Sequence, residues 1–128
     1  MVTGQVADVR PYLESAEVFV APLRMARGVQ NKILEAMGAG LPVVCTTAAL
    51  AGLDARPGED LLVGDTPEDF ASHAVSLLRN RERASGLGRS AAEFVRRHHE
   101  WDGQLERLET SLVQVVRRQE NHAFERVE

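Results

Sequence analysis

The stretch that decides the fold is residues 18–46, which reads VFVAPLRMARGVQNKILEAMGAGLPVVCT. Its two ends, Val18–Ala21 and Pro42–Thr46, are short apolar runs, typical of strands buried on both faces of a parallel sheet. A helix is predicted between them, from about Gln30 to Ala39, with one apolar face. Gly40 suits the end of that helix, because glycine readily takes the left-handed conformation of a helix C-terminus. The stretch therefore predicts a strand–helix–strand unit with a right-handed crossover.

Elements on either side extend this pattern. Leu61–Val63 is predicted to be a third short strand, and Thr66–Asp69 opens a helix with a capping threonine, a proline and two acids. A further helix is expected from about Glu82 to Arg97. The sequence thus predicts an α/β fold, a partial Rossmann-like domain whose short parallel sheet of about three strands is flanked by helices, with a helix-rich C-terminal half.

Local expectations fill in the rest of the chain. Val2–Gly4 looks like the end of a strand, and Asp8 is expected to cap a short helix that has Pro11 in its first turn. Residues 47–60 are expected to form a loop. The residues predicted to face the core are Val9, Leu13 and Ala16 in the first helix, Phe70, Ala74, Val75 and Leu78 in the helix after Thr66, and Leu87, Ala91 and Phe94 in the helix after it. A last helix, capped by Trp101-Asp102, carries Leu105, Leu108, Leu112 and Val115, and residues 119–128 form a charged, frayed tail.

Composition excludes several classes of function. The chain has 128 residues, a net charge of −4 and 5% aromatic residues, so neither a nucleic-acid surface nor a base-stacking platform is expected. It has no apolar run of roughly 18 residues that could span a membrane, and no signal peptide is apparent. A single cysteine, Cys45, cannot form an internal disulfide and fits a reducing, cytoplasmic compartment.

The segment Arg27–Glu35 carries the most specific chemistry. Gly28 permits a tight turn and close approach of a ligand, and the helix start after it offers backbone N–H groups that lack intrahelical partners. Lys32 adds a positive charge. Glu35 lies one turn further on, where a carboxylate can accept hydrogen bonds from two vicinal ribose hydroxyls. These features suit a nucleotide, although an ordinary capped helix with a solvated face explains them as well.

Other polar residues allow weaker interpretations. His98-His99-Glu100 looks like a solvated helix end, because adjacent helical residues do not face one another and no metal-binding cluster accompanies them. Cys45 is expected to be a small buried residue of a strand. Arg24 and Arg27 are either a diphosphate clamp or exposed charge, and Trp101 is expected to be a packing anchor. The acids expected to be solvated loop residues are Asp54, Glu59 and Asp60.

With its flanks, the segment resembles the C-terminal half of the group 1 (family 4) glycosyltransferases, which have the two-domain GT-B fold. The resemblance runs through Val2–Gly4, Asp8–Leu13, Ala16–Arg24, Arg27–Met37, Gly40–Val44, Gly58–Val63 and Phe70-Ala71, with Trp101 where the family often has an aromatic residue before its last helix. It implies that residues 1–118 are part of a nucleotide-sugar-binding domain that needs no cofactor and no metal. The intact enzyme would transfer a sugar, with retention of configuration, to a lipid-linked, polysaccharide or small-molecule acceptor.

The resemblance also assigns the site. Glu35 matches the second glutamate of the family's paired-glutamate motif, which usually holds the ribose hydroxyls. Arg27 stands where the first glutamate is expected, so the catalytic assignment and the sugar contact stay open. The turn that faces the diphosphate and the sugar is matched by Gly28, Val29, Gln30 and Asn31, with Lys32 beside it.

Several parts of such an enzyme would lie outside this chain, namely the acceptor domain and the first strands of the nucleotide domain. In the usual strand order of doubly wound sheets, Val2–Gly4 would be strand 3, two strands away from Val18–Ala21. The edge of Val18–Ala21 would then be unpaired, which predicts self-association, and the chain alone would be inactive. A lipid-linked acceptor would place the intact enzyme at the inner face of the membrane. The alternative is a non-catalytic α/β module that pairs with a partner through this edge.

Overall fold

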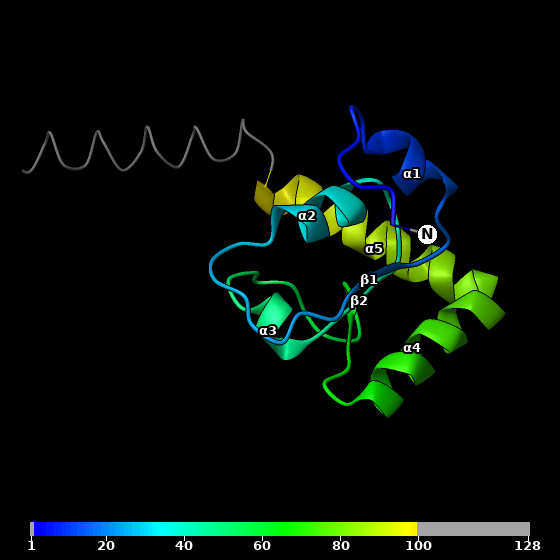
Figure 1. Cartoon of the computed structure of the whole chain (residues 1–128). Coiled ribbons are helices and arrows are strands. Elements are labelled where there is room, and N and C mark those ends of the chain that lie inside the picture. The colour runs from blue at the N-terminus through cyan, green and yellow to red at the C-terminus, as the bar shows by residue number, and fades with distance from the viewer. Residues whose placement is uncertain (1, 100–128) are drawn as a thin grey trace, which may run out of the picture. The chain divides into compact units, whose positions relative to one another are not determined.

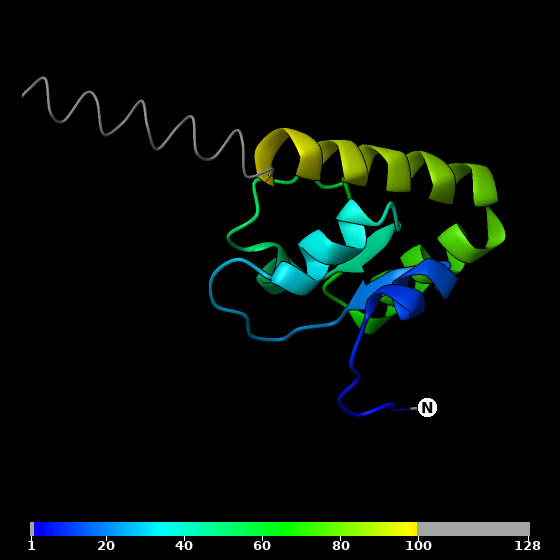
Figure 2. The same ribbon diagram turned by 90° about the horizontal axis from the view of Figure 1, so that it is seen from above.

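The computed structural model describes residues 2–99. Three parallel strands form its sheet, in the order β1 (Phe19–Ala21), β2 (Val43–Cys45) and β3 (Leu62–Val63). The sheet is flanked by helices, as Figures 1 and 2 show. The predicted α/β class, with a short parallel sheet of three strands consistent with a partial Rossmann-like domain, is therefore confirmed. The helices are α1 (Arg10–Ser15), α2 (Asn31–Gly38), α3 (Thr47–Leu50), α4 (Pro67–Arg79) and α5 (Arg81–His99).

The core divides into two clusters on opposite faces of the sheet, because successive strand residues point to opposite faces. Val43 and Cys45 contribute to a cluster with α2 and α5, whereas Val44 and Leu62 contribute to a cluster with Leu77 of α4. In Figure 2, α5 (yellow-green) and α2 (cyan) both lie on the same side of β1 (blue). On α5 the predicted inward residues are confirmed as buried, namely Leu87, Ala91 and Phe94.

The end of α2 is built as the sequence predicts. Ala39 caps the helix, and Gly40 follows it with a φ of 77°. The N–H of Gly40 donates to Met37 O at 2.9 Å, and the N–H of Leu41 donates to Ala36 O at 3.0 Å. This pair of bonds is the Schellman motif, in which a left-handed residue satisfies the last helical carbonyls. It turns the chain directly into β2.

Some local predictions are wrong. Val2–Gly4 is not a strand, and Val2 is 96% exposed. The segment 47–60 is not all loop, because it contains α3, whose first N–H groups bond to the side chains of Thr46 and Asp65. On α4 the buried side chain is Leu77, while Val75 and Leu78 are 41% and 52% exposed. The helix packs on Val44 and Leu62 through the face of Phe70 and Leu77.

The first helix largely follows the prediction. It begins at Arg10, one residue later than a cap at Asp8 implies, yet the Asp8 carboxylate still accepts the N–H of Arg10 at 3.0 Å. Leu13 and Ala16 pack against the core, but Val9 is 44% exposed. The expectations for Glu100, for the last helix after Trp101 and for the tail concern residues outside the described part of the chain.

A helix cap gives a first testable prediction. Thr66 Oγ1 accepts the N–H of Asp69 at 3.1 Å and donates to the Asp69 carboxylate at 2.8 Å, at the start of α4. We expect Thr66→Ala to lower the free energy of unfolding by about 1 kcal/mol, the usual cost of losing such a cap. Thr66→Ser keeps the hydroxyl, so its free energy of unfolding should stay within a few tenths of a kcal/mol of the parent's. Urea denaturation followed by circular dichroism measures both, and equal stabilities for the two variants would contradict the assignment.

Candidate functional site

The carboxyl ends of the three strands meet at one edge of the sheet, where α/β proteins of this kind bind ligands. Hydrogen bonds connect the segments that leave the strands. Thr46, after β2, donates its hydroxyl to Leu23 O at 2.6 Å, and Leu23 lies just after β1. Asp65, after β3, accepts the N–H and the hydroxyl of Thr47 at 2.8 and 2.7 Å. The hydrogen bonds from Thr47 hold the pKa of Asp65 below its ordinary value. The loops at this edge are therefore tied to one another.

The turn before α2 is held in place from two sides. Gly28 has a φ of 66°, a conformation that side chains rarely adopt. The amide of Gln30 donates to the carbonyl oxygens of Arg27 and Gly28, both at 3.2 Å. Gly52, just after α3, lies so close that an added Cβ would be 3.1–3.3 Å from the backbone of Gly28 and Val29. The predicted turn thus has a fixed backbone, and the side chain of Gln30 stabilises it through these hydrogen bonds.

The N–H groups that open α2 are not blocked by a side chain. Gln30 occupies the N-cap position without a side-chain cap, and its carbonyl oxygen accepts the N–H groups of Ile33 and Leu34 at 2.9 and 3.3 Å. The N–H groups of Asn31 and Lys32 precede the first helical bond, and the described residues offer them no acceptor. Asn31, Lys32, Gly28 and Val29 are all exposed. This helix start can therefore receive an anion from solvent.

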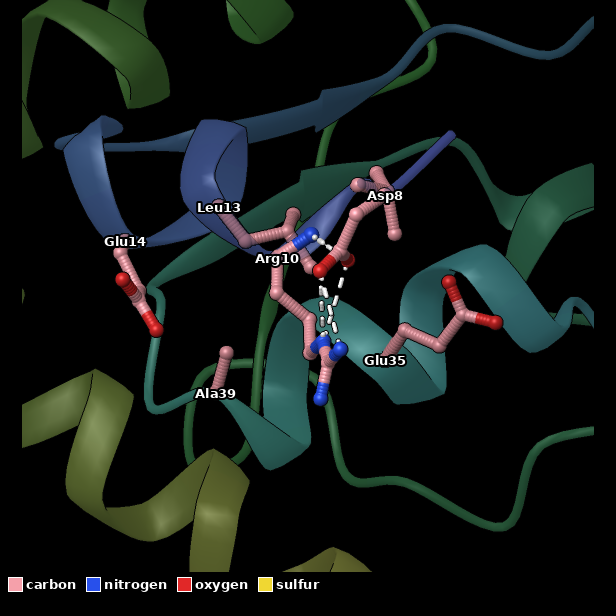
Figure 3. A pocket seen from close by; sticks show the side chains of 7 residues that line it. Asp8, Arg10, Leu13, Glu14, Glu35 and Ala39 are labelled. Carbon is pink, nitrogen blue, oxygen red and sulfur yellow. Dashed lines mark hydrogen bonds and ion pairs between the residues drawn. The ribbon is translucent and has the colours of Figure 1, made fainter. Parts of the chain in front are cut away.

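Glu35 points away from the core. It is exposed, and its carboxylate makes no hydrogen bond or ion pair with the described residues. Glu35 lines a cleft of about 550 Å³ between α1 and α2, and in Figure 3 its carboxylate points away from the guanidinium of Arg10. The other residues that line the cleft are Asp8, Val9, Arg10, Leu13, Glu14 and Ala39.

Sequence reasoning missed the contribution of α1 to this cleft. Arg10 forms a two-pronged pair with Asp8, in which Nε and Nη2 of the arginine lie 3.0 and 2.9 Å from the two carboxylate oxygens. The pair lowers the pKa of Asp8 and raises the pKa of Arg10. It leaves Glu14 and Glu35 as the cleft's remaining charges. The spacing Asp-x-Arg at a helix start was the available signal, because both side chains can then turn back over the first turn.

The remaining candidate residues fall outside this cleft. Cys45 is fully buried, and burial together with the nearby charge of Asp65 raises its pKa to about 11, so its thiol stays protonated. The prediction that Asp60 is a solvated loop residue is wrong, because Asp60 is only 1% exposed. Asp54 and Glu59 are exposed. Among residues 2–99, no group of three or more His, Cys, Asp or Glu side chains is placed to hold a metal ion.

A short parallel α/β sheet with an open helix start at the carboxyl ends of its strands is typical of Rossmann-like domains, which bind their ligands at that edge. A model of the family "Glycosyl transferases group 1" matches residues 1–80 of the chain. The chain therefore belongs to the group 1 glycosyltransferase family. A search of curated proteins found no significant match. In the part of the chain that the structure describes, no helix combines the length and the apolarity needed to cross a membrane.

Proposed function

We propose that this chain binds the nucleotide-diphosphate sugar donor of a glycosyltransferase. The observation that carries the proposal is the position of Glu35 in the wall of the cleft, one turn from the N–H groups of Asn31 and Lys32. Glu35 is exposed, and neither its carboxylate nor these N–H groups have a partner among residues 2–99. Membership of the family supports glycosyl transfer in general. A ribose hydrogen-bonded to Glu35 would direct its phosphates toward the start of α2 and its base into the cleft.

The chemistry that follows is stabilisation of a leaving group. When the bond between the sugar and the diphosphate breaks, negative charge builds up on the departing phosphate. The N–H groups at the start of α2, the positive end of the helix dipole and Lys32 would stabilise that charge. Glu35 would position the nucleotide and would not act as a base. Retention of anomeric configuration and transfer without a metal are part of this proposal, as is a cytoplasmic location.

Replacing Glu35 tests the proposal directly. We expect the 128-residue chain to bind UDP or GDP at roughly millimolar affinity, because an open cleft encloses little of a ligand. Glu35→Gln should weaken that binding about tenfold, because a hydrogen bond to a charged group contributes about 1.5–3 kcal/mol. Amide chemical shifts in an NMR titration report the affinity and show whether residues 28–35 respond.

The matched control is Glu82→Gln, since Glu82 is exposed in the first turn of α5 and makes no ion pair with the described residues. Both variants should unfold within about 0.5 kcal/mol of the parent, as surface substitutions do. An undiminished affinity in Glu35→Gln, or shifts confined to other parts of the chain, would overturn the proposal.

The alternative function is a module that pairs through β1. This strand lies at an edge of the described sheet, and its middle residue, Val20, is 47% exposed. Unpaired strand edges readily add another strand. Sedimentation velocity distinguishes the two functions. Two results together would favour the module. The chain would form dimers that Val20→Lys abolishes, and its NMR spectrum would not change when UDP or GDP is added.

A further inference from the structure

The segment that leaves β1 carries an unusual excess of positive charge. Residues 18–34 contain three basic residues and no Asp or Glu. Arg24, Arg27 and Lys32 are exposed, and none of them makes a side-chain hydrogen bond or ion pair with the described residues. Four arginines elsewhere in the described residues lie within 4 Å of a carboxylate, namely Arg10, Arg56, Arg81 and Arg96. The loop therefore keeps positive charge that the described fold does not neutralise.

The axis of α2 sets the order in which a bound donor would meet this charge. The cleft begins beside Ala39, Glu35 comes next, and the free N–H groups lie at Asn31. At 1.5 Å per residue, Glu35 and Asn31 are about 6 Å apart along the axis, a length that a ribose–phosphate linkage can span. A donor with its ribose at Glu35 thus has its diphosphate at the helix start. Its sugar then lies beyond the helix, on the side of the turn that Arg27 begins.

Arg27 is suited to meet a charge on that sugar. Its carbonyl oxygen accepts a hydrogen bond from the side-chain amide of Gln30 at 3.2 Å, so its backbone is fixed, whereas its side chain is exposed and has no partner within the described part of the chain. Lys32 and the N–H groups at the positive end of α2 would match the two negative charges of a diphosphate diester bound there. A guanidinium beyond them is free to bind one more anion, and its planar fork fits a carboxylate in two-pronged geometry.

We propose that the donor sugar carries a carboxylate, as in a nucleotide-diphosphate uronic acid, and that Arg27 is the residue that selects it. This inference rests on the proposed function and adds the substrate class to it. Exposed ion pairs contribute modestly. We therefore expect a preference of about threefold to fivefold for the charged donor over its neutral counterpart.

The test compares donors that differ only at carbon 6 of the sugar, UDP-glucuronate against UDP-glucose and GDP-mannuronate against GDP-mannose. NMR titration of the 128-residue chain measures each affinity. The uronate donor should bind more tightly to the parent chain. Arg27→Met should abolish the preference while leaving the affinity for the neutral donor nearly unchanged, and Arg27→Glu should reverse it. Lys32→Met should lower the affinity for both donors by the same factor.

Arg79→Met is the matched control. Arg79 is also an exposed arginine without a side-chain bond to the described residues, but it lies in the last turn of α4, so the preference should persist in this variant. The inference would be overturned if the parent chain bound the two donors with equal affinity, or if Arg27→Met weakened the binding of both donors by the same factor. Either result would leave the proposed function standing. If no UDP or GDP compound binds and Glu35→Gln changes nothing, the proposed function fails and this inference fails with it.

Discussion

Gly88→Ala is expected to lower the free energy of unfolding by about 3 kcal/mol, or to prevent folding. Gly88 lies where α5 crosses the turn between α2 and β2. A Cβ there would overlap the carbonyl oxygen of Gly40 and come 3.0 Å from its carbonyl carbon. Both atoms belong to the backbone of the Schellman motif, so they cannot rotate away as a flexible side chain would. Urea denaturation monitored by circular dichroism measures the loss.

Gly86, two residues earlier in the same helix, is the control. The nearest atom to a Cβ built there is the end of the Arg89 side chain at 4.0 Å. Gly86→Ala should therefore stabilise the chain by about 0.5–1 kcal/mol, because alanine loses less backbone entropy than glycine in a helix. If Gly88→Ala were as stable as Gly86→Ala, the close crossing of α5 over Gly40 would be wrong.

Asp60→Ala is expected to lower the free energy of unfolding by about 2–4 kcal/mol. Asp60 is 1% exposed, and its carboxylate accepts the N–H of Arg56 at 2.9 Å, the Arg56 guanidinium at 3.3 Å and the Ser90 hydroxyl at 3.1 Å. These bonds connect the loop before β3 to α5. Asp54→Asn is the control, since Asp54 is exposed in the same loop. This variant should lower the free energy of unfolding by less than about 0.5 kcal/mol.

Asp60 also gives the stability a dependence on pH. Burial alone would raise the pKa of Asp60, but the hydrogen bonds from Arg56 and Ser90 outweigh it and hold that pKa below its ordinary value. The unfolded chain then takes up the proton first, so the stabilisation is present above the unfolded pKa of about 3.9 and is lost as pH falls through the folded pKa. Asp60→Asn should lessen the loss of stability below about pH 4. If the pH dependence of stability were the same in Asp60→Asn as in the parent, the Asp60 carboxylate would not be ionised in the folded chain.

Local pattern was sufficient for much of the fold. The runs at β1 and β2 are apolar throughout, which distinguishes buried parallel strands, and Gly40 fixed the end of α2 by its conformational freedom. Where the partner is distant, pattern failed. The cap of α3 depends on Asp65, 18 residues after Thr47, and the burial of Asp60 depends on Ser90, 30 residues later. Neither contact leaves a trace in the local sequence.

Along α4 the sequence allowed more than one apolar stripe. Phe70, Ala74 and Leu77 satisfy the helical period as well as Phe70, Ala74 and Leu78 do. The side chain that is buried depends on how the helix lies on Val44 and Leu62, which is a property of packing. For the site, the turn at Gly28, the helix start and an exposed Glu35 lie where the sequence placed them, whereas the wall from α1 and the support from Gly52 come from segments that the motif does not include.

The sequence by itself determined the strand–turn–helix–strand unit and the set of polar groups near its turn, because those follow from residues within one helical turn of each other. Only the tertiary structure decided that Glu35 has a cleft beside it and that no residue between Val2 and His99 pairs with the charges of Arg24, Arg27 and Lys32. Such properties depend on which distant segments approach. A carboxylate or a guanidinium is available to a ligand only when no other part of the chain has bound it.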